Sequence, residues 1–140
     1  MSLLDVFDIA GSAMSSESVR LNVTASNLAN AQSVGPDEAS TYRARQPVFS
    51  AVMQSLHGGI EGSASVGVKV DGIVESQAPL EQRYQPEHPM ANEEGYVYVP
   101  NVNMIDEMSN MISASRSYQS NVEVLNTSKQ LLLATLRLGQ

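Results

Sequence analysis

The sequence has no cysteine, no tryptophan and only two histidines. Without cysteine the chain forms no disulfide bond, thiolate zinc site or cysteine nucleophile, although this leaves the cellular compartment open. The histidines, His57 and His88, have no metal-ligand spacing to each other or to a group of carboxylates. The sequence also has neither a nucleophilic serine elbow nor a phosphate-binding loop. It therefore predicts no metal, no cofactor and no enzyme.

Basic residues are also scarce. Eight Lys and Arg stand against fifteen Asp and Glu, and the net charge is −7, which argues against a nucleic-acid partner. Residues 35–107 hold eleven acids and four bases, whereas residues 108–140 hold one acid and three bases. We therefore expect the middle of the chain to be its solvated part.

Long hydrophobic runs are missing too. No apolar run approaches the ~20 residues of a membrane span, so we expect no direct insertion into a membrane. The first basic residue is Arg20, and Asp5 and Asp8 interrupt the apolar positions near the N-terminus. This pattern is unlike a cleaved signal peptide. The 140 residues, 42% of them hydrophobic, suit one domain with a modest core.

What the sequence does contain is a long apolar periodicity in its C-terminal third. Alternating steps of four and three residues pass through Met104, Met108, Met111, Ser115, Tyr118, Val122, Leu125, Lys129, Leu132 and Leu136. Eight of these ten positions are apolar or aromatic, a heptad pattern that predicts a helix with one buried seam. Asn103 is placed to cap this helix and Gly139 to end it.

The predicted helix over 103–138 is too long for an ordinary core helix. It would measure about 54 Å, whereas a compact globule of this size is nearer to 40 Å across. Its last turns are apolar almost all round, through Leu131, Leu132, Leu133, Leu136 and Leu138, with Val124 extending this second stripe. A core helix in a small bundle remains the alternative. The shortage of other helical surface in the chain favours burial against other subunits.

The N-terminal stretch repeats the same pattern. Heptad steps pass through Leu3, Phe7, Ala10, Met14, Glu17, Leu21, Thr24 and Leu28, six of which are apolar. Ser2 can cap this helix, which we expect to run to about Asn30, before the break at residues 34–37. We predict an α+β fold in which the long N- and C-terminal helices pack as an antiparallel coiled-coil-like hairpin. The helical domain then comprises 1–31 and 103–140, and a small β/loop-rich middle domain comprises 32–102.

Within the middle domain the sequence predicts short strands. Residues 41–53 look like a strand broken by Pro47, and residues 66–74 alternate as a strand should. Residues 55–65 are rich in glycine and serine and predict a loop, and residues 85–90, with two prolines, predict an extended connector. Residues 92–95 predict a hairpin turn that leads into a strand over 96–99.

Several motifs resemble those of bacterial flagellar rod proteins. Residues 25–31 read Ala-Ser-Asn-Leu-Ala-Asn-Ala, similar to an N-terminal motif of flagellar axial proteins, although Ser26 replaces the usual Asn. Similar segments follow at 95–108, 115–121, 123–128 and 136–139, and in the opening residues 3–13. Among these proteins the chain is most similar to those of the proximal rod. The longer stretch 32–42 departs from the family's short turn.

This resemblance implies a structural subunit that polymerises with itself and other axial proteins into the proximal rod. The implied partners are other flagellar rod proteins, the rod-base adaptor and the flagellar type III export apparatus. The implied location is the periplasm-spanning rod of the basal body, reached without a cleaved signal peptide. The expected assembly interface consists of Leu3, Phe7, Met14, Leu21, Asn27, Leu28, Asn30, Met104, Met108, Met111, Tyr118, Val122, Leu125, Leu131, Leu132 and Leu136.

The alternative is a soluble binding module. In that reading the helical hairpin holds one partner helix in its groove, as an export adaptor or chaperone would. Concentration-dependent polymerisation distinguishes the two hypotheses, because an adaptor forms a closed complex of finite size.

Overall fold

The computed structural model describes residues 3–54 and 65–138. Its elements follow the order α1 (Leu3–Asn30), β1 (Arg45–Gln54), β2 (Ser65–Glu75), β3 (Glu81–Tyr84), β4 (Tyr96–Val99) and α2 (Met104–Leu138). The predicted α+β class is confirmed, with a long helix at each end and strands between. The predicted caps Ser2 and Gly139, and the predicted loop with His57, lie outside the described residues.

Both helices begin and end close to their predicted residues. The Oδ1 atom of Asn103 accepts hydrogen bonds from the backbone N–H groups of Ile105 at 3.1 Å and Asp106 at 3.4 Å. Asn103 is therefore the N-cap of α2, as predicted, because its side chain satisfies donors that the first helical turn leaves free. No glycine or proline interrupts the 35 residues of α2, which lets one helix continue through the C-terminal third.

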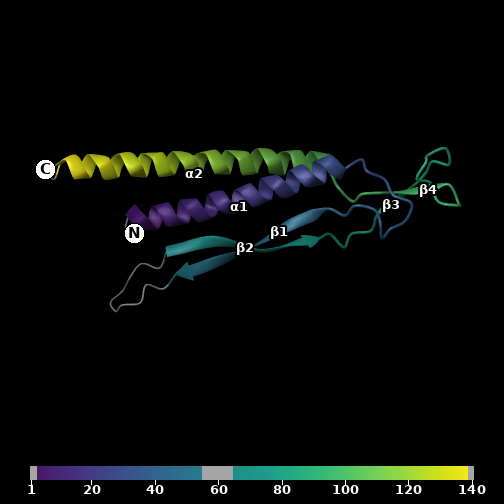
Figure 1. Cartoon of the computed structure of the whole chain (residues 1–140), viewed down its shortest axis with the longest axis horizontal. Helices are drawn as coiled ribbons and strands as arrows, with labels where there is room; N and C mark the ends of the chain where they lie inside the picture. The colour runs from purple at the N-terminus through teal and green to yellow at the C-terminus, as the bar shows by residue number, and fades with distance from the viewer. Residues whose placement is uncertain (1–2, 55–64, 139–140) are drawn as a thin grey trace.

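The molecule is elongated and built in layers (Figure 1). α2 lies against α1, and α1 in turn contacts β1 and β2. α2 begins beside the end of α1, runs back along it and projects past its start (Figure 1). At 1.5 Å per residue, α2 with 35 residues measures about 52 Å and α1 with 28 residues about 42 Å. Coiled-coil packing of this pair remains a prediction.

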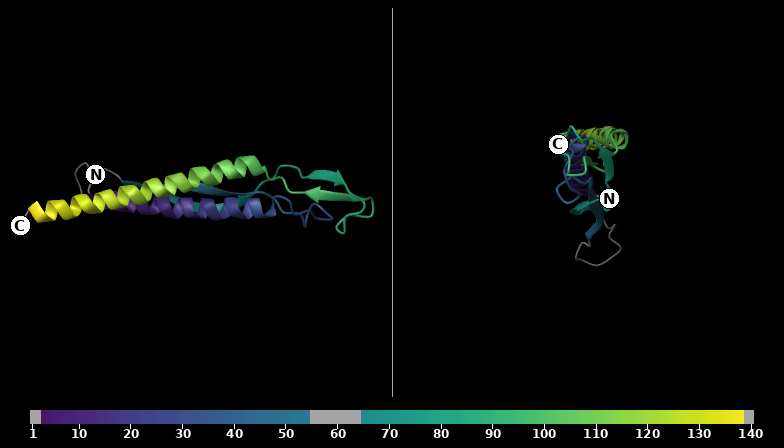
Figure 2. Two further views of the ribbon diagram at one scale, coloured as in Figure 1. Left: turned by 90° about the horizontal axis from the view of Figure 1, so that it is seen from above. Right: turned by 90° about the vertical axis from the view of Figure 1, so that its right-hand side faces the viewer.

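The two antiparallel hairpins of the middle region are separate two-stranded sheets. In the first, β1 pairs with β2 from Arg45 opposite Glu75 to Gln54 opposite Ser65, with a register shift at Val48/Phe49. This hairpin runs beside α1, whereas β3 and β4 lie beyond the helices at the far end of the molecule (Figure 2). The prediction that Pro47 breaks the first strand is wrong. A two-stranded sheet leaves each strand one open edge, so a residue without an N–H group is tolerated there.

The second sheet contains a strand that the sequence did not predict. β3 pairs with β4 from Glu81 opposite Val99 to Tyr84 opposite Tyr96. The predicted hairpin turn before β4 is confirmed: the N–H of Gly95 bonds the carbonyl of Asn92 at 2.9 Å, and Gly95 has a φ of 82°, which glycine adopts without strain.

The stretch 85–90, predicted to be extended, forms two consecutive turns instead. They are closed by backbone hydrogen bonds from His88 to Gln85 at 3.1 Å and from Ala91 to His88 at 2.9 Å. Each turn has a proline as its second residue, Pro86 or Pro89. The φ angle that proline imposes suits this position of a turn as well as it suits an extended chain.

The interior of the described chain is small and polar. Its buried apolar residues are Ala10, Val23, Ala31, Ala44, Val97 and Ala114. Its buried polar residues are equally numerous: Ser16, Thr24, Asn27, Thr41, Glu107 and Ser128. The accessible surface is 9715 Å², whereas a compact monomer of 15.1 kDa exposes about 7,100 Å². The fold therefore leaves far more surface uncovered than a self-contained domain of its mass.

Candidate functional site: the surfaces of α2

The face of α2 that meets α1, called the seam below, carries small and polar residues. Glu107, Ala114 and Ser128 are 8%, 0% and 7% exposed, and they recur at multiples of seven residues. Half-buried residues fill the alternate heptad positions, namely Met111, Tyr118 and Leu125. Among the described elements α1 is the only one that α2 packs against. The small seam residues therefore allow the two helices to approach closely.

The seam differs from the predicted one at three of the alternate heptad positions. Met111, Tyr118 and Leu125 lie on it as expected. At three other positions the buried residue precedes the predicted one: Glu107 replaces Met108, Ala114 replaces Ser115 and Ser128 replaces Lys129. Val122 is half-buried, as is its neighbour Asn121. Met108 is instead 52% exposed. Glu107, which is buried instead, accepts a hydrogen bond from Asn27 at 3.0 Å.

Asn27 lies at the point where α1, the start of β1 and the start of α2 meet, and it is 1% exposed. Its Nδ2 group donates to the carbonyl of Arg45 at 2.8 Å and to Oε1 of Glu107 at 3.0 Å. Its Oδ1 atom accepts from the hydroxyl of Tyr42 at 2.8 Å and from the N–H of Arg45 at 2.9 Å. All four hydrogen-bonding positions of the amide are thus used. Asn27, Tyr42, Arg45 and Glu107 are called the Asn27 cluster below.

The carboxyl group of Glu107 is the ionisable member of this cluster inside the seam. Burial raises the pKa of Glu107 above its ordinary value of 4.5, the hydrogen bond from Asn27 lowers it, and the charge of Asp106 raises it further. The arginines nearby are paired elsewhere: Arg20 with Glu17 at 3.5 Å and Arg45 with Glu75 at 3.2 Å. The amide of Asn27 therefore binds this buried carboxyl group, whereas Arg20 and Arg45 pair with other carboxylates.

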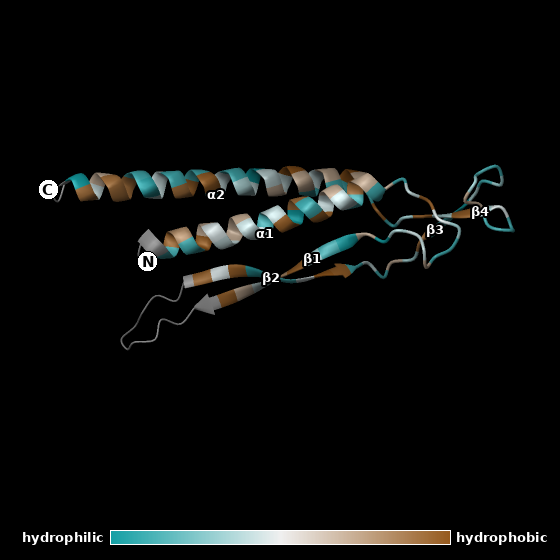
Figure 3. Cartoon of the chain, in the orientation of Figure 1, coloured by the Kyte–Doolittle hydropathy of each residue, from teal (hydrophilic) through white to brown (hydrophobic). Residues whose placement is uncertain are grey.

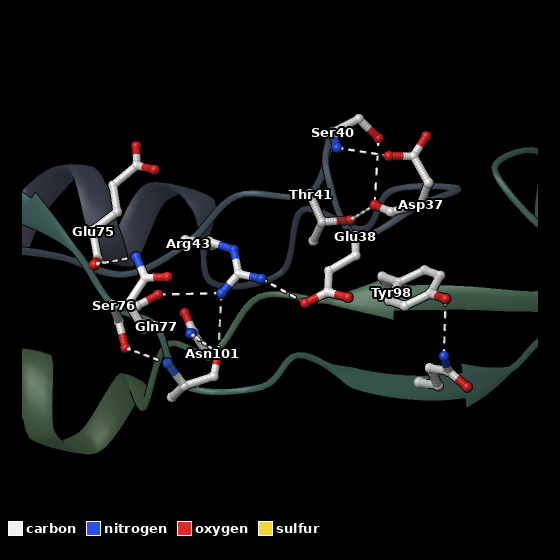
Figure 4. A network of polar contacts seen from close by, with 12 residues as sticks. Asp37, Glu38, Ser40, Thr41, Arg43, Glu75, Ser76, Gln77, Tyr98 and Asn101 are labelled. Atoms are coloured by element: carbon white, nitrogen blue, oxygen red, sulfur yellow. Dashed lines mark hydrogen bonds and ion pairs between the residues drawn. The ribbon is translucent and has the colours of Figure 1, made fainter.

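A second polar network joins three segments of the middle region, the last of which leads into α2 (Figure 4). The guanidinium of Arg43 donates to the carbonyls of Ser76 at 3.2 Å and Ala78 at 3.1 Å and pairs with Glu38 at 2.6 Å. Asn101 accepts from the N–H of Ala44 at 2.8 Å and donates to the carbonyl of Ala78 at 2.8 Å. The segments before β1, after β2 and before α2 are thereby held together.

α1 also approaches β2 through small residues. Ser12 accepts a hydrogen bond from the N–H of Val68 at 3.2 Å, and Ser16 donates to the carbonyl of Val68 at 3.5 Å. A Cβ atom at Gly67 would lie 3.2 Å from the hydroxyl of Ser12. These serines use backbone groups at the open edge of β2, which would otherwise be free to pair with another strand.

Large apolar side chains lie on the opposite face of α2. Ile105, Met108 and Ile112, called the outer stripe below, are 78%, 52% and 54% exposed. At 100° per residue they lie about 130° around the helix from the seam. Together with Arg116 they line a shallow groove. In the ribbon coloured by hydropathy, brown segments recur along α2 (Figure 3).

The end of α2 is the second exposed apolar surface. Leu131, Leu132, Leu133 and Leu136, called the leucine end below, are 55%, 36%, 45% and 62% exposed. Leu132 and Leu136 continue the side of α2 that faces α1, but α2 has by then run past the start of α1 (Figure 1). Nothing in the described chain covers them. The first β-hairpin adds further exposed apolar residues, among them Ile73 and Val74.

The predicted interface residues therefore fall into two groups. Asn27 is buried, and the half-buried residues are Phe7, Met14, Leu21, Leu28, Asn30, Met111, Tyr118, Val122 and Leu125. The exposed residues are Met104, Met108, Leu131, Leu132 and Leu136. The side chain of Leu3 lies outside the described residues. Ile105 and Ile112 were missed by the sequence prediction, although their spacing of seven residues, with Met108 between them, marks one helical face.

Both terminal regions of the chain, each of which contains a long helix, match known protein families. The family described as "Flagella basal body rod protein" matches residues 7–36, and "Flagellar basal body rod FlgEFG protein C-terminal" matches residues 93–138. The chain is 54% identical to the flagellar basal-body rod protein FlgC of Escherichia coli O157:H7 over 140 residues, which is 100% of both chains. The chain belongs to the FlgC family of flagellar basal-body rod proteins.

Other FlgC proteins align over the same full length. The FlgC of Salmonella typhimurium is 53% identical over 140 residues, and that of Buchnera aphidicola subsp. Acyrthosiphon pisum 44% over 142 residues, each covering 100% of both chains. The chain is thus a structural subunit of the flagellar basal-body rod and not an enzyme. Neither helix, within its described residues, is long and apolar enough to cross a membrane. Residues 3–54 and 65–138 contain no group of three or more His, Cys, Asp or Glu that could hold a metal ion.

Proposed function

We propose that this FlgC-family chain polymerises with copies of itself and with other axial proteins into the proximal rod, around the type III export channel. The terminal segments 1–31 and 103–140 form the core tube as an antiparallel coiled-coil-like pair, and residues 32–102 form a separate middle domain outside it. The observation that carries this proposal is the position of the outer stripe and the leucine end, which no other described element covers.

Exposed apolar side chains at both ends of one helix favour an open assembly. Burying one isoleucine or leucine fully contributes about 1.5–3 kcal/mol, but for these residues the gain requires another chain. The two surfaces lie near opposite ends of α2 (Figure 1) and differ in composition. Contacts between unlike patches are head-to-tail, and such contacts generate helical filaments or rings instead of closed dimers.

The charge distribution favours the same arrangement. Lys129 and Arg137 lie near the end of α2, whereas Asp106 lies at its start, next to the acidic middle region. Contacts that bring the end of one subunit near the start of another are therefore electrostatically complementary, which steers association. The proposed partners are other flagellar rod proteins, the rod-base adaptor and the export apparatus. The proposed location is the periplasm-spanning rod, reached without a cleaved signal peptide.

Incorporation of variants into purified basal bodies tests this function. We expect Ile105→Asp and Leu136→Asp each to be secreted but absent from rods, because an unpaired carboxylate at an interface costs several kcal/mol. Gln85→Asp, an exposed position in the turns before β4, is the matched control and should incorporate normally. Normal rods with both interface variants would contradict the proposal.

The alternative, a binding module or export adaptor, predicts a different result. It requires the purified chain to form a complex of fixed stoichiometry with one partner helix, and to be absent from washed basal bodies. Size measurement of reconstituted complexes over a range of concentrations separates growth by polymerisation from a finite complex.

A further inference from the structure

We propose that the buried pair Asn27 and Glu107 is a rotational lock, which holds α2 in the orientation that keeps the outer stripe on the surface. The use of this lock rests on the proposed assembly function, but the lock itself is a property of the single chain. Asn27 and Glu107 are thus positioning residues: they do not belong to the outer stripe, but they set the direction in which it faces.

The apolar pattern of α2 alone favours a different orientation. Heptad steps through Met108 would place a larger apolar side chain against α1 than the observed steps through Glu107, and Val122, already half-buried, would turn further inward. The observed orientation of α2 and the one with Met108 inward both place Met111 against α1. They differ by a rotation of about 50° around the helix axis. Hydrophobic burial by itself would therefore turn Met108 inward and withdraw part of the outer stripe.

The Asn27 cluster opposes this roll. Asn27 donates to Oε1 of Glu107 at 3.0 Å, and the residues are 1% and 8% exposed. The other three hydrogen bonds of Asn27 go to Tyr42 and Arg45, so its side chain cannot follow a moving helix without losing partners. Rolling α2 toward Met108 would break the Glu107 contact and leave a buried amide donor unpaired, which is costly. Single buried polar residues are known to fix the register of paired helices in this way.

Single cysteines can report the roll, because the native chain has none. Ser128 lies on the seam and is 7% exposed. Ser115 is half-buried and lies on the face that would turn toward α1 if α2 rolled. Serine and cysteine differ by one atom, so Ser128→Cys and Ser115→Cys disturb the packing little. Labelling by a thiol reagent is measured in concentrated sodium sulfate, which strengthens burial, once far-UV circular dichroism shows that the helices have formed.

In the otherwise native chain, Ser128→Cys should label about tenfold more slowly than Ser115→Cys. Adding Asn27→Leu removes the partner of Glu107, and we expect the order of the two rates to invert as α2 rolls. Adding Glu107→Leu as well should restore the native order, because an apolar pair again favours residue 107 in the seam. Asn30→Leu is the control, since the side chain of Asn30 donates to the carbonyl of Ser26 in its own helix, at 2.9 Å, and should leave the order unchanged.

Three results would overturn the lock. An unchanged order of rates in Asn27→Leu means that the orientation does not depend on this pair. Equal, fast labelling at both sites means that the helices separate instead of rolling. Failure of the double variant to restore the order assigns the effect to the lost contacts with Tyr42 and Arg45. Because every rate is measured on the isolated chain, these outcomes are independent of whether the chain enters a rod.

Discussion

The two faces of α2 invert the usual arrangement of an amphipathic helix. The buried positions of the seam, which is covered by α1, are Glu107, Ala114 and Ser128, with Met111, Tyr118 and Leu125 half-buried between them, whereas the outer stripe, which faces solvent, contains Ile105, Met108 and Ile112. A surface helix of a self-contained protein places its apolar stripe toward its own core. This inversion indicates that the contact within the chain serves to position the helix, and that most of the hydrophobic stabilisation is left for contacts with other chains.

The remainder of the chain supports this view. The largest fully buried side chains are Val97 and Asn27, one in β4 and one in α1. No large apolar residue is fully buried between the two helices in the described part of the chain. Polar contacts therefore define the geometry of the single subunit, and much of its apolar surface stays exposed and available for contacts with other chains. Each prediction below tests one side of this contrast.

The largest effect is expected for Leu125→Asp. Leu125 is half-buried on the seam, and a carboxylate there costs several kcal/mol when neighbouring subunits exclude water. We expect the variant to be exported but not incorporated, which immunoblots of culture medium and of purified basal bodies would measure. Leu125→Met, which conserves volume, is the control and should incorporate. Normal motility of the Asp variant would show that this side of α2 remains wet in the rod.

We expect the terminal helices to be largely unfolded in the dilute subunit. Eleven of the 35 residues of α2 are Ser, Asn or Thr. Each costs about 0.5 kcal/mol relative to Ala in a helix, for a total on the order of 6 kcal/mol. Burial at the seam within one chain offsets only a small part of this cost. Hydrogen exchange of amides 104–136 should then approach unfolded rates, whereas Val97 retains protection. Strong protection along α2 at low concentration would mean that the seam alone stabilises the pair.

The sequence predicted the helices well because their signals are local. Periodicity, the Asn103 cap and the lack of glycine or proline in α2 all act within a few residues. It predicted the wrong residue at three seam positions, where Glu107, Ala114 and Ser128 are buried, because the heptad register was set by the apolar residues alone. The partner that decides, Asn27, was recognised only through its motif, and it lies 80 residues from Glu107 in the sequence.

The middle region shows the same limit. β2 alternates apolar and other residues and was predicted, whereas β3 consists of Glu-Gln-Arg-Tyr and is exposed throughout. It has no apolar face of its own and exists because it pairs with β4. A strand defined only by its partner leaves no pattern in its own residues.

A moderate effect is expected for Ala114→Leu. Ala114 is 0% exposed in the seam, so three added carbon atoms force the helices apart and cost about 1–3 kcal/mol. The variant should need more sodium sulfate to form helix, as followed by far-UV circular dichroism. Ser113→Leu, one residue earlier and exposed, should shift the midpoint little. Equal midpoints for the two variants would show that the seam tolerates large residues and that its small size is incidental.

The smallest effect is expected from the protonation of Glu107. Because burial raises its pKa in the folded chain above 4.5, the folded state takes up a proton before the unfolded state does as the pH falls. The seam is therefore most stable below about pH 4.5 and loses stability as the pH rises through the higher folded pKa. Glu107→Gln keeps an oxygen that accepts from Asn27 and removes the charge. We expect it to form helix at lower sulfate than the native chain at neutral pH, with the difference vanishing in acid.

The pH experiment must be read as a difference between these two chains. Asp37 has the opposite tendency, because hydrogen bonds from Ser40 lower its pKa in the folded state, so its contribution is lost as the pH falls. Both chains contain Asp37, and subtraction removes its effect. If Glu107→Gln instead needs more sulfate at neutral pH, the charged carboxylate stabilises the seam. The hydrogen bond with Asn27 would then outweigh the desolvation of Glu107. The charged pair would stabilise the seam instead of costing stability.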